Sequence, residues 1–286
     1  MSDTLKQAFA HANYLLKQGN YAQAQKILEN ILDQHPEQYE ALLNLGIAYA
    51  HNDKLDLAIP LFHKVIQTHP QNLGALYNLG LAYSLQQDHE QAYIAYQTAL
   101  TFYPKDLDLL SNLSATLVDL ERYEEALNIC QQILQADPDR KIAWVNQALA
   151  LDKLQRHEQA LKAYEGALRI DPFDMRCLRN SGIALYEMQQ AHNALGPFQT
   201  VAKALPTDAV NWCYLGLSYH QLGETQKAIA ALETSIRLDP QNKEVHQHLG
   251  RCLLKIGQHQ EGLQKIRYST GSILLNLKEQ RIWINE

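Results

Sequence analysis

Asparagine recurs every 34 residues through the middle of the chain, at Asn44, Asn78, Asn112, Asn146 and Asn180. A carboxamide carries an acceptor and two N–H donors, so a row of them could pair with the backbone of an extended peptide. Because asparagine is a mediocre helix former, helix propensity does not explain its recurrence. In the alternative interpretation, each amide bonds a neighbouring helix or a turn. The row predicts either a peptide-binding surface or a set of packing contacts.

Signals for catalysis are weak in this sequence. It contains no phosphate-binding glycine loop, no HExxH motif and no GxSxG motif. His248 and Cys252 form an i, i+4 pair near His246, but a pair alone does not make a closed metal site. The four cysteines form no CxxC pair and are expected to be free thiols. We therefore expect no catalytic residues, no cofactor and no metal.

A second recurrence shows which elements position the asparagines. Proline has no backbone N–H and disfavours helix at the preceding residue, so a proline at a fixed interval ends a helix at the same point of each copy. Counting from the residue 31 before each proline, repeats begin at residues 5, 39, 73, 107, 141, 175 and 209, with a proline-less eighth at 243. This period predicts a stacked array in which each copy contacts its neighbours. The prolines are Pro36, Pro70, Pro104, Pro138, Pro172, Pro206 and Pro240.

Each repeat is predicted to be a helical hairpin. Positions 8 and 20 hold only Gly, Ala or Ser, which allows two helices to approach closely, and large apolar residues follow at helical spacing on both sides of a polar break. Gly19, Gly223 and Gly257 lie in that break, where a residue free to adopt positive φ helps to end the first helix. Pro60 and Pro197 lie early in second helices, and we expect a kink or a late helix start there.

These columns resemble the tetratricopeptide repeat family, with Trp144 and Trp212 at position 4, Tyr49, Tyr83 and Tyr219 at position 11, and Phe62, Tyr96, Tyr164 and Phe198 at position 24. The resemblance covers residues 5 to 266 and implies an all-α, right-handed superhelical solenoid, with residues 1–266 as the array. It also implies that positions 2, 5, 6, 9, 12 and 13 of the first helices line a concave groove. The asparagines occupy position 6, and their row is similar to the asparagine ladder of O-linked N-acetylglucosamine transferases, which holds protein substrates by the backbone.

The expected peptide-binding set joins the five asparagines to neighbouring groove positions. Its other members are Ile47, Tyr77, Leu81, Leu149, Ile183, Arg176 and Arg179. The apolar members could instead be buried between first helices, and the two arginines could be solvated. The row stops at Tyr214 and His248, so the groove is expected to centre on repeats two to six.

The expected partner is a protein segment in extended conformation. The formal charge of -6 and pI near 6.0 disfavour nucleic acid, and no apolar run reaches the length of a membrane span. The N-terminus shows no leader pattern, which favours the cytoplasm. Chaperone adaptors of the resembled family grip a carboxylate with a lysine at position 5 that this chain lacks, so an Hsp70 or Hsp90 tail is not expected.

The function expected from these observations is a non-catalytic scaffold or adaptor. Two alternatives remain open: a substrate-recruiting partner of a separate catalytic chain such as a glycosyltransferase, and a scaffold that assembles with itself. Residues 267–286 fall outside the repeat. Two short runs in this segment, rich in β-branched and aromatic residues, are separated by residues 278–280, which favours a hairpin that caps the array or forms a homodimer.

Overall fold

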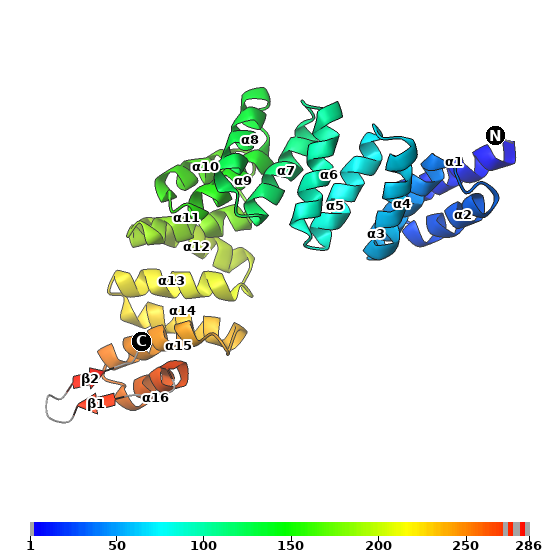
Figure 1. Ribbon diagram of the computed structural model, residues 1–286. Coiled ribbons are helices and arrows are strands. Elements are labelled where there is room, and N and C mark those ends of the chain that lie inside the picture. The colour runs from blue at the N-terminus through cyan, green and yellow to red at the C-terminus, as the bar shows by residue number, and fades with distance from the viewer. Residues whose placement is uncertain (1–2, 271–273, 277–280, 284–286) are drawn as a thin grey trace. The chain divides into compact units, whose positions relative to one another are not determined.

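The chain is built from consecutive helical hairpins (Figure 1). A computed structural model describes residues 3–270, 274–276 and 281–283, and these residues form sixteen helices and two short strands. From the second repeat onward, each first helix begins at the residue predicted from the proline period, which confirms the all-α solenoid. The helices are α1 (Asp3–Lys17), α2 (Tyr21–Gln34), α3 (Tyr39–His51), α4 (Leu55–Thr68), α5 (Leu73–Leu85), α6 (His89–Phe102), α7 (Leu107–Asp119), α8 (Tyr123–Ala136), α9 (Lys141–Lys153), α10 (His157–Ile170), α11 (Met175–Glu187), α12 (Ala191–Ala204), α13 (Ala209–Gln221), α14 (Thr225–Leu238), α15 (Lys243–Lys255) and α16 (His259–Thr270).

The chain divides into two compact halves, Met1–Asn146 and Gln147–Glu286, which we describe separately. In the N-terminal half, α3 contacts both α1 and α5, and α5 contacts α7. In the C-terminal half, α13 contacts α11 and α15 in the same way. The first helices of successive repeats therefore lie side by side in each half. We call the surface that they form the first-helix face, and the opposite surface the second-helix face.

The two helices of a hairpin meet where a glycine faces a large side chain. A Cβ atom added to Gly80 would lie 2.5 Å from the Tyr96 ring, and one added to Gly182 would lie 2.7 Å from the Phe198 ring. Tyr96 and Phe198 occupy position 24 and are buried. The large side chain at position 24 therefore packs against the small residue predicted at position 8.

The break between the two helices has one backbone conformation throughout the array. Position 15 has positive φ in all eight repeats, the described residues being Gly19, Asp53, Gln87, Glu121, Gln155, Gln189, Gly223 and Gly257. The sequence indicated this turn only at the three glycines. The other five residues adopt the same left-handed conformation, because two helices joined by so short a connection require it.

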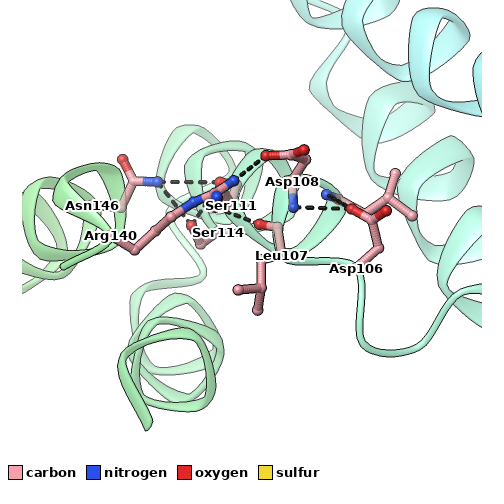
Figure 2. Close-up of polar contacts among 8 residues, drawn as sticks. Asp106, Leu107, Asp108, Ser111, Ser114, Arg140 and Asn146 are labelled. Carbon is pink, nitrogen blue, oxygen red and sulfur yellow. Dashed lines mark hydrogen bonds and ion pairs between the residues drawn. The ribbon is translucent and has the colours of Figure 1, made fainter. Parts of the chain in front are cut away.

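The residue before most first helices caps the helix N-terminus. Asp106 accepts hydrogen bonds from the N–H groups of Asp108 and Leu109, at 3.0 and 2.9 Å (Figure 2). Asn72, Asp174, Asp208 and Asn242 cap their helices in the same way. Arg140 stands at the equivalent position before α9 and pairs with the Asp108 carboxylate instead. These caps satisfy N–H groups that a helix leaves unpaired at its first turn.

Of the kink or late helix start expected at Pro60 and Pro197, the late start is wrong, and a kink stays a prediction. Helix α4 begins five residues before Pro60, and α12 begins six residues before Pro197. Pro60 is exposed, so water can replace the missing N–H donor at the carbonyl one turn earlier.

Beyond α16, two strands pair near the C-terminus. β1 (Leu274–Asn276) and β2 (Arg281–Trp283) are antiparallel, with Leu275 opposite Ile282. The connecting residues 277–280 of the expected hairpin lie outside the described residues. Among the described helices, none combines the length and the hydropathy that a membrane span needs.

Candidate peptide-binding surface

The asparagines of position 6 lie on the first-helix face, but their amides have different partners. Asn44 donates from Nδ2 to Oδ1 of Asn13, at 2.6 Å, and so bridges α3 to α1. Asn78 donates to the carbonyl oxygen of Gly74 in its own helix, at 2.8 Å. Both side chains are half-buried. Each amide therefore has one donor engaged and part of its surface available.

Asn146 lies in the interior. Its side chain is only 4% exposed, and Nδ2 donates to the carbonyl oxygen of Ser111 at 3.2 Å and to Oγ of Ser114 at 2.8 Å (Figure 2). Asn146 therefore fastens α9 to α7, which is the packing role considered for this column.

Asn112 carries an unsatisfied donor. Its Nδ2 atom is buried and, among the described residues, has no hydrogen-bond partner. Asn44 bonds to Asn13, which occupies position 9 of the preceding repeat. For Asn112, the same position of the preceding repeat holds Leu81, which has no acceptor in its side chain. A buried amide without a partner costs about 1–3 kcal/mol, so this donor is the one in the row that most needs an acceptor.

Asn180 contacts a buried polar pair in the C-terminal half. Its amide hydrogen-bonds to the Tyr164 hydroxyl, which donates to Oδ2 of Asp152 at 2.6 Å. Burial and the neighbouring Asp152 raise the pKa of Tyr164, and burial also raises the pKa of Asp152. Asn180 is therefore part of the packing between α11 and α10.

Apolar side chains reach the surface beside Asn78. Leu81 is 38% exposed and Leu85 is 60% exposed, both on α5, and Tyr77 one turn earlier is half-buried. Ile47 on α3 is half-buried and packs against the core around Phe62. The exposed part of the apolar row is thus Leu81 together with its neighbour Leu85, which occupies groove position 13 but was not in the expected peptide-binding set.

The predicted positions in the C-terminal half are more strongly engaged. Nη1 of Arg179 lies 2.7 Å from Oδ2 of Asp208, and this aspartate also caps α13. Arg176 is exposed, whereas Leu149 and Ile183 are half-buried. Arg179 is therefore a link between α11 and α13, and Arg176 is the arginine whose side chain is accessible.

An aromatic cluster lies where the asparagine row stops. The Tyr186 and Tyr214 rings meet edge to face at 5.6 Å, and Phe198 stacks on Tyr214 at 6.0 Å. Burial raises the pKa of Tyr214, and Glu187 and Glu244 add to the effect. In the sequence, this cluster is indicated by Tyr214 at position 6 together with Tyr186 at position 12 of the preceding repeat.

The thiols and histidines do not form a reactive or metal-binding centre within residues 3–270. Burial raises the pKa of Cys130 to about 11 and that of Cys213 to about 12, so both thiols stay protonated near neutral pH. Cys252 contacts Nδ1 of His220 at 3.2 Å, whereas His246 contacts the Pro240 carbonyl oxygen at 3.0 Å. No three His, Cys, Asp or Glu side chains of the described residues lie close enough together to bind a metal.

We predict that two histidines make the C-terminal half sensitive to acid. Burial lowers the pKa of His248 and of His220, and the Arg251 guanidinium lowers both further, although Glu244 opposes the shift of His248. A folded-state pKa below the unfolded value of 6.5 means that the native state binds fewer protons. The contribution of these histidines to the stability of the native state is therefore present above pH 6.5 and is lost as the pH falls through the folded-state pKa.

Urea unfolding at about pH 7.5 and about pH 5 tests this prediction. His248→Gln should lose less stability between the two pH values than the unmodified chain, because glutamine cannot take up the proton. His192→Gln, a change at an exposed histidine of the same half, should retain the full dependence. An unchanged slope in His248→Gln would contradict the prediction.

Comparison with known proteins agrees with this architecture. Tetratricopeptide repeat family models match residues 9–72 and 113–174 in one case and 74–106 in another, which is more than half of the 286 residues. A family model described as anaphase-promoting complex, cyclosome, subunit 3 matches residues 185–267. No curated protein sequence matches the chain significantly.

Several solved structures share the fold. A tetratricopeptide repeat protein from Parabacteroides merdae ATCC 43184 is 16% identical with a TM-score of 0.67, covering 88% of this chain and all of its own. MamA from Desulfovibrio magneticus RS-1 is 23% identical with a TM-score of 0.56, covering 58% of this chain and 94% of its own. YrrB, described as a TPR protein with an unusual peptide-binding site, is 18% identical with a TM-score of 0.53, covering 64% of this chain and 95% of its own.

Proposed function

This chain belongs to the tetratricopeptide repeat family, and from that membership we propose that it is a non-catalytic scaffold whose first-helix face binds an extended segment of a partner protein. The proposal rests chiefly on the exposed leucines of α5. Leu81 and Leu85 present large apolar side chains to solvent on a face where amide groups lie alongside. Burial of such side chains by a partner contributes about 25 cal/mol per Å² of apolar surface.

The amides give this surface polar groups that suit a peptide backbone. Asn44 and Asn78 keep part of their donor and acceptor capacity, and Asn112 has a donor without a partner among the described residues. A peptide carbonyl that reached Asn112, after a small rotation of the side chain, would satisfy that donor. Hydrogen bonds to the peptide backbone do not depend on the peptide sequence, whereas the leucines favour peptides with apolar side chains.

In the C-terminal half, the proposed contacts are those whose side chains are accessible. Arg176 is exposed, and Asn180, Ile183 and Leu149 are half-buried. Arg179 and Asn146 support this face by holding neighbouring first helices together. YrrB, which shares the fold, is described as having a peptide-binding site, and this supports the same class of ligand here.

We predict that Leu81→Asp with Leu85→Asp will weaken partner binding by tenfold or more, roughly 1.4 kcal/mol. Two carboxylates would replace the apolar surface that the partner buries, and the fold should be retained because both leucines are exposed. Binding is measured by pull-down from cell extract followed by titration of the partner that is identified. Leu57→Asp with Ile94→Asp is the matched control, because these residues are similarly exposed, at 52% and 51%, but lie on second helices.

A photo-crosslinking amino acid placed at Leu85 or at Ile94 provides a second readout. The partner should be crosslinked from position 85 and not from position 94. Equal binding by the variant with two aspartates and by its control, together with crosslinks from position 94 alone, would rule out the first-helix face as the binding surface.

A further inference from the structure

A pocket lies on the second-helix face of the C-terminal half, and its lining contains no residue of the proposed peptide-binding surface. It has a volume of about 550 Å³ and lies between α12 and α14, with α13 as its floor. Its lining includes Trp212 and Tyr219 on α13, together with the buried Ala202, Leu215 and Ala231. The size suits one or two large side chains of a partner.

The pocket arises from one small residue in an otherwise large column. Ala202 occupies position 28, where the other repeats with a complete second helix have Leu32, Ile66, Leu100, Leu134, Leu168 and Ile236. The missing side chain leaves space beside the indole of Trp212. Trp144, at the same position two repeats earlier, follows Leu134 and therefore has a large neighbour at this position.

The indole of Trp212 is held in place without any ligand. Its Nε1–H donates to the carbonyl oxygen of Pro206 at 2.9 Å, and Trp144 makes the same bond to Pro138 at 2.8 Å. In both tryptophan repeats, the preceding proline thus supplies an acceptor that fixes the indole at position 4. A rigid aromatic wall is prepared for binding at little cost in side-chain entropy.

Other polar groups around the pocket also make internal hydrogen bonds. Nε2 of Gln199 donates to the Tyr219 hydroxyl at 3.0 Å, and the Thr234 hydroxyl donates to the Ala230 carbonyl oxygen at 2.9 Å. Much of the lining is carbon surface, from Ala202, Trp212 and Leu215 among others. An apolar side chain is the group that can enter at no cost in lost hydrogen bonds.

The charged groups at the rim are lysines. Lys203 and Lys227 line the pocket, and no acidic residue does so among the described residues. Lys203 is exposed and has no ion-pair partner in the described part of the chain. Lys227 lies 5.4 Å from the centre of the Tyr219 ring and pairs with Glu224 at the surface, an arrangement that a second carboxylate could share. The rim is thus complementary to acidic groups, although the chain as a whole is acidic.

We propose that this pocket is a docking site for an acidic, amphipathic segment of a partner protein. The segment inserts a bulky apolar side chain between α12 and α14 and places carboxylates against Lys203 and Lys227. This contact is separate from the first-helix face, so one chain can hold two protein segments at the same time.

The test uses the full chain and labelled peptides of about 12 residues whose binding is followed by fluorescence anisotropy. The first peptide has a central Phe and Leu three residues apart with Glu and Asp on both sides. In the second, Lys replaces the acidic residues, and in the third, Ala replaces Phe and Leu. The first peptide should bind roughly tenfold more tightly than either of the others, and added salt should weaken it.

Ala202→Leu gives a selective way to fill the pocket. Leucine is the residue of four other repeats at this position, so the helix should fold normally, as circular dichroism can verify. The first peptide should bind this variant at least tenfold more weakly. Lys203→Glu should reverse the preference between the acidic and basic peptides, whereas Lys162→Glu, on the exposed side of α10, should not.

Three outcomes would overturn the proposal. In the first, no peptide binds or Ala202→Leu binds as tightly as the unmodified chain. In the second, the acidic and basic peptides bind equally. In the third, sedimentation shows a dimer that Ala202→Leu abolishes, which would make a second copy of this chain the occupant. The variant Leu81→Asp with Leu85→Asp should still bind the acidic peptide, so failure of either proposed site can be recognised separately.

Discussion

Replacing Gly80 with leucine should lower the free energy of unfolding by about 3 kcal/mol, and this is among the largest effects that we expect. A Cβ atom at Gly80 would already lie 2.5 Å from the Tyr96 ring, and leucine adds three further carbon atoms in the same direction. Tyr96 is 1% exposed and is enclosed by the hairpin, so it cannot move aside without separating α5 from α6. Urea unfolding followed by circular dichroism measures the loss.

Two further variants distinguish a local clash from a general intolerance of this helix to change. Gly80→Ala should lose less than Gly80→Leu, because a single Cβ atom requires a smaller shift of the Tyr96 ring and alanine gains about 1 kcal/mol in helix propensity over glycine. Ala148 beside Tyr164, at the same two positions, shows that the repeat can accommodate this pair. In Gly80→Leu with Tyr96→Ala, the two losses should be clearly less than additive. Full additivity would show that position 8 does not act through position 24.

Phe198→Ala should destabilise the C-terminal half by about 3–5 kcal/mol, as truncation of a fully buried aromatic residue usually does. The ring is 0% exposed, lies over Gly182 and stacks on Tyr214 at 6.0 Å. Alanine would leave a cavity between α11 and α12 that the backbone cannot close, because Gly182 supplies no side chain to fill it. The free energy of unfolding from urea titration is the relevant measurement.

Phe198→Leu is the matched control. Leu232 occupies the same position over Gly216 in the next repeat, so leucine is compatible with a glycine at position 8. We expect it to lose about 1 kcal/mol, since most of the apolar volume is kept. If Phe198→Ala and Phe198→Leu lost the same free energy of unfolding, ring stacking and not the filled volume would dominate at this site.

The recurring columns predicted the scaffold well. The proline period placed the start of every first helix from repeat two onward, and the small residues at positions 8 and 20 marked the contact between helices. These features depend on backbone chemistry and on side-chain volume, which act within one repeat or between neighbours. The turn at position 15 was visible only at glycines, because five other residues take the left-handed conformation under constraint from the hairpin.

The partners of the position 6 amides were beyond the reach of the repeat pattern. Asn44, Asn112 and Asn146 are identical in register, yet one bridges to Asn13, one has an unpaired donor and one is buried against Ser111 and Ser114. The difference lies in the preceding repeat, whose positions 5, 8 and 9 vary. The residue type at position 6 alone therefore does not show which side chain or backbone group each asparagine will contact.

The sequence by itself determined that this chain is a helical repeat array, because a 34-residue period in proline and in small residues can be satisfied only by stacked hairpins. The tertiary structure decided which of those residues reach the surface. Leu81 and Leu85 are exposed, Asn146 is buried, and Ala202 opens a pocket beside Trp212. The physical reason is that helix formation follows from residues within one repeat, whereas exposure and hydrogen bonding depend on side chains that adjacent repeats bring together.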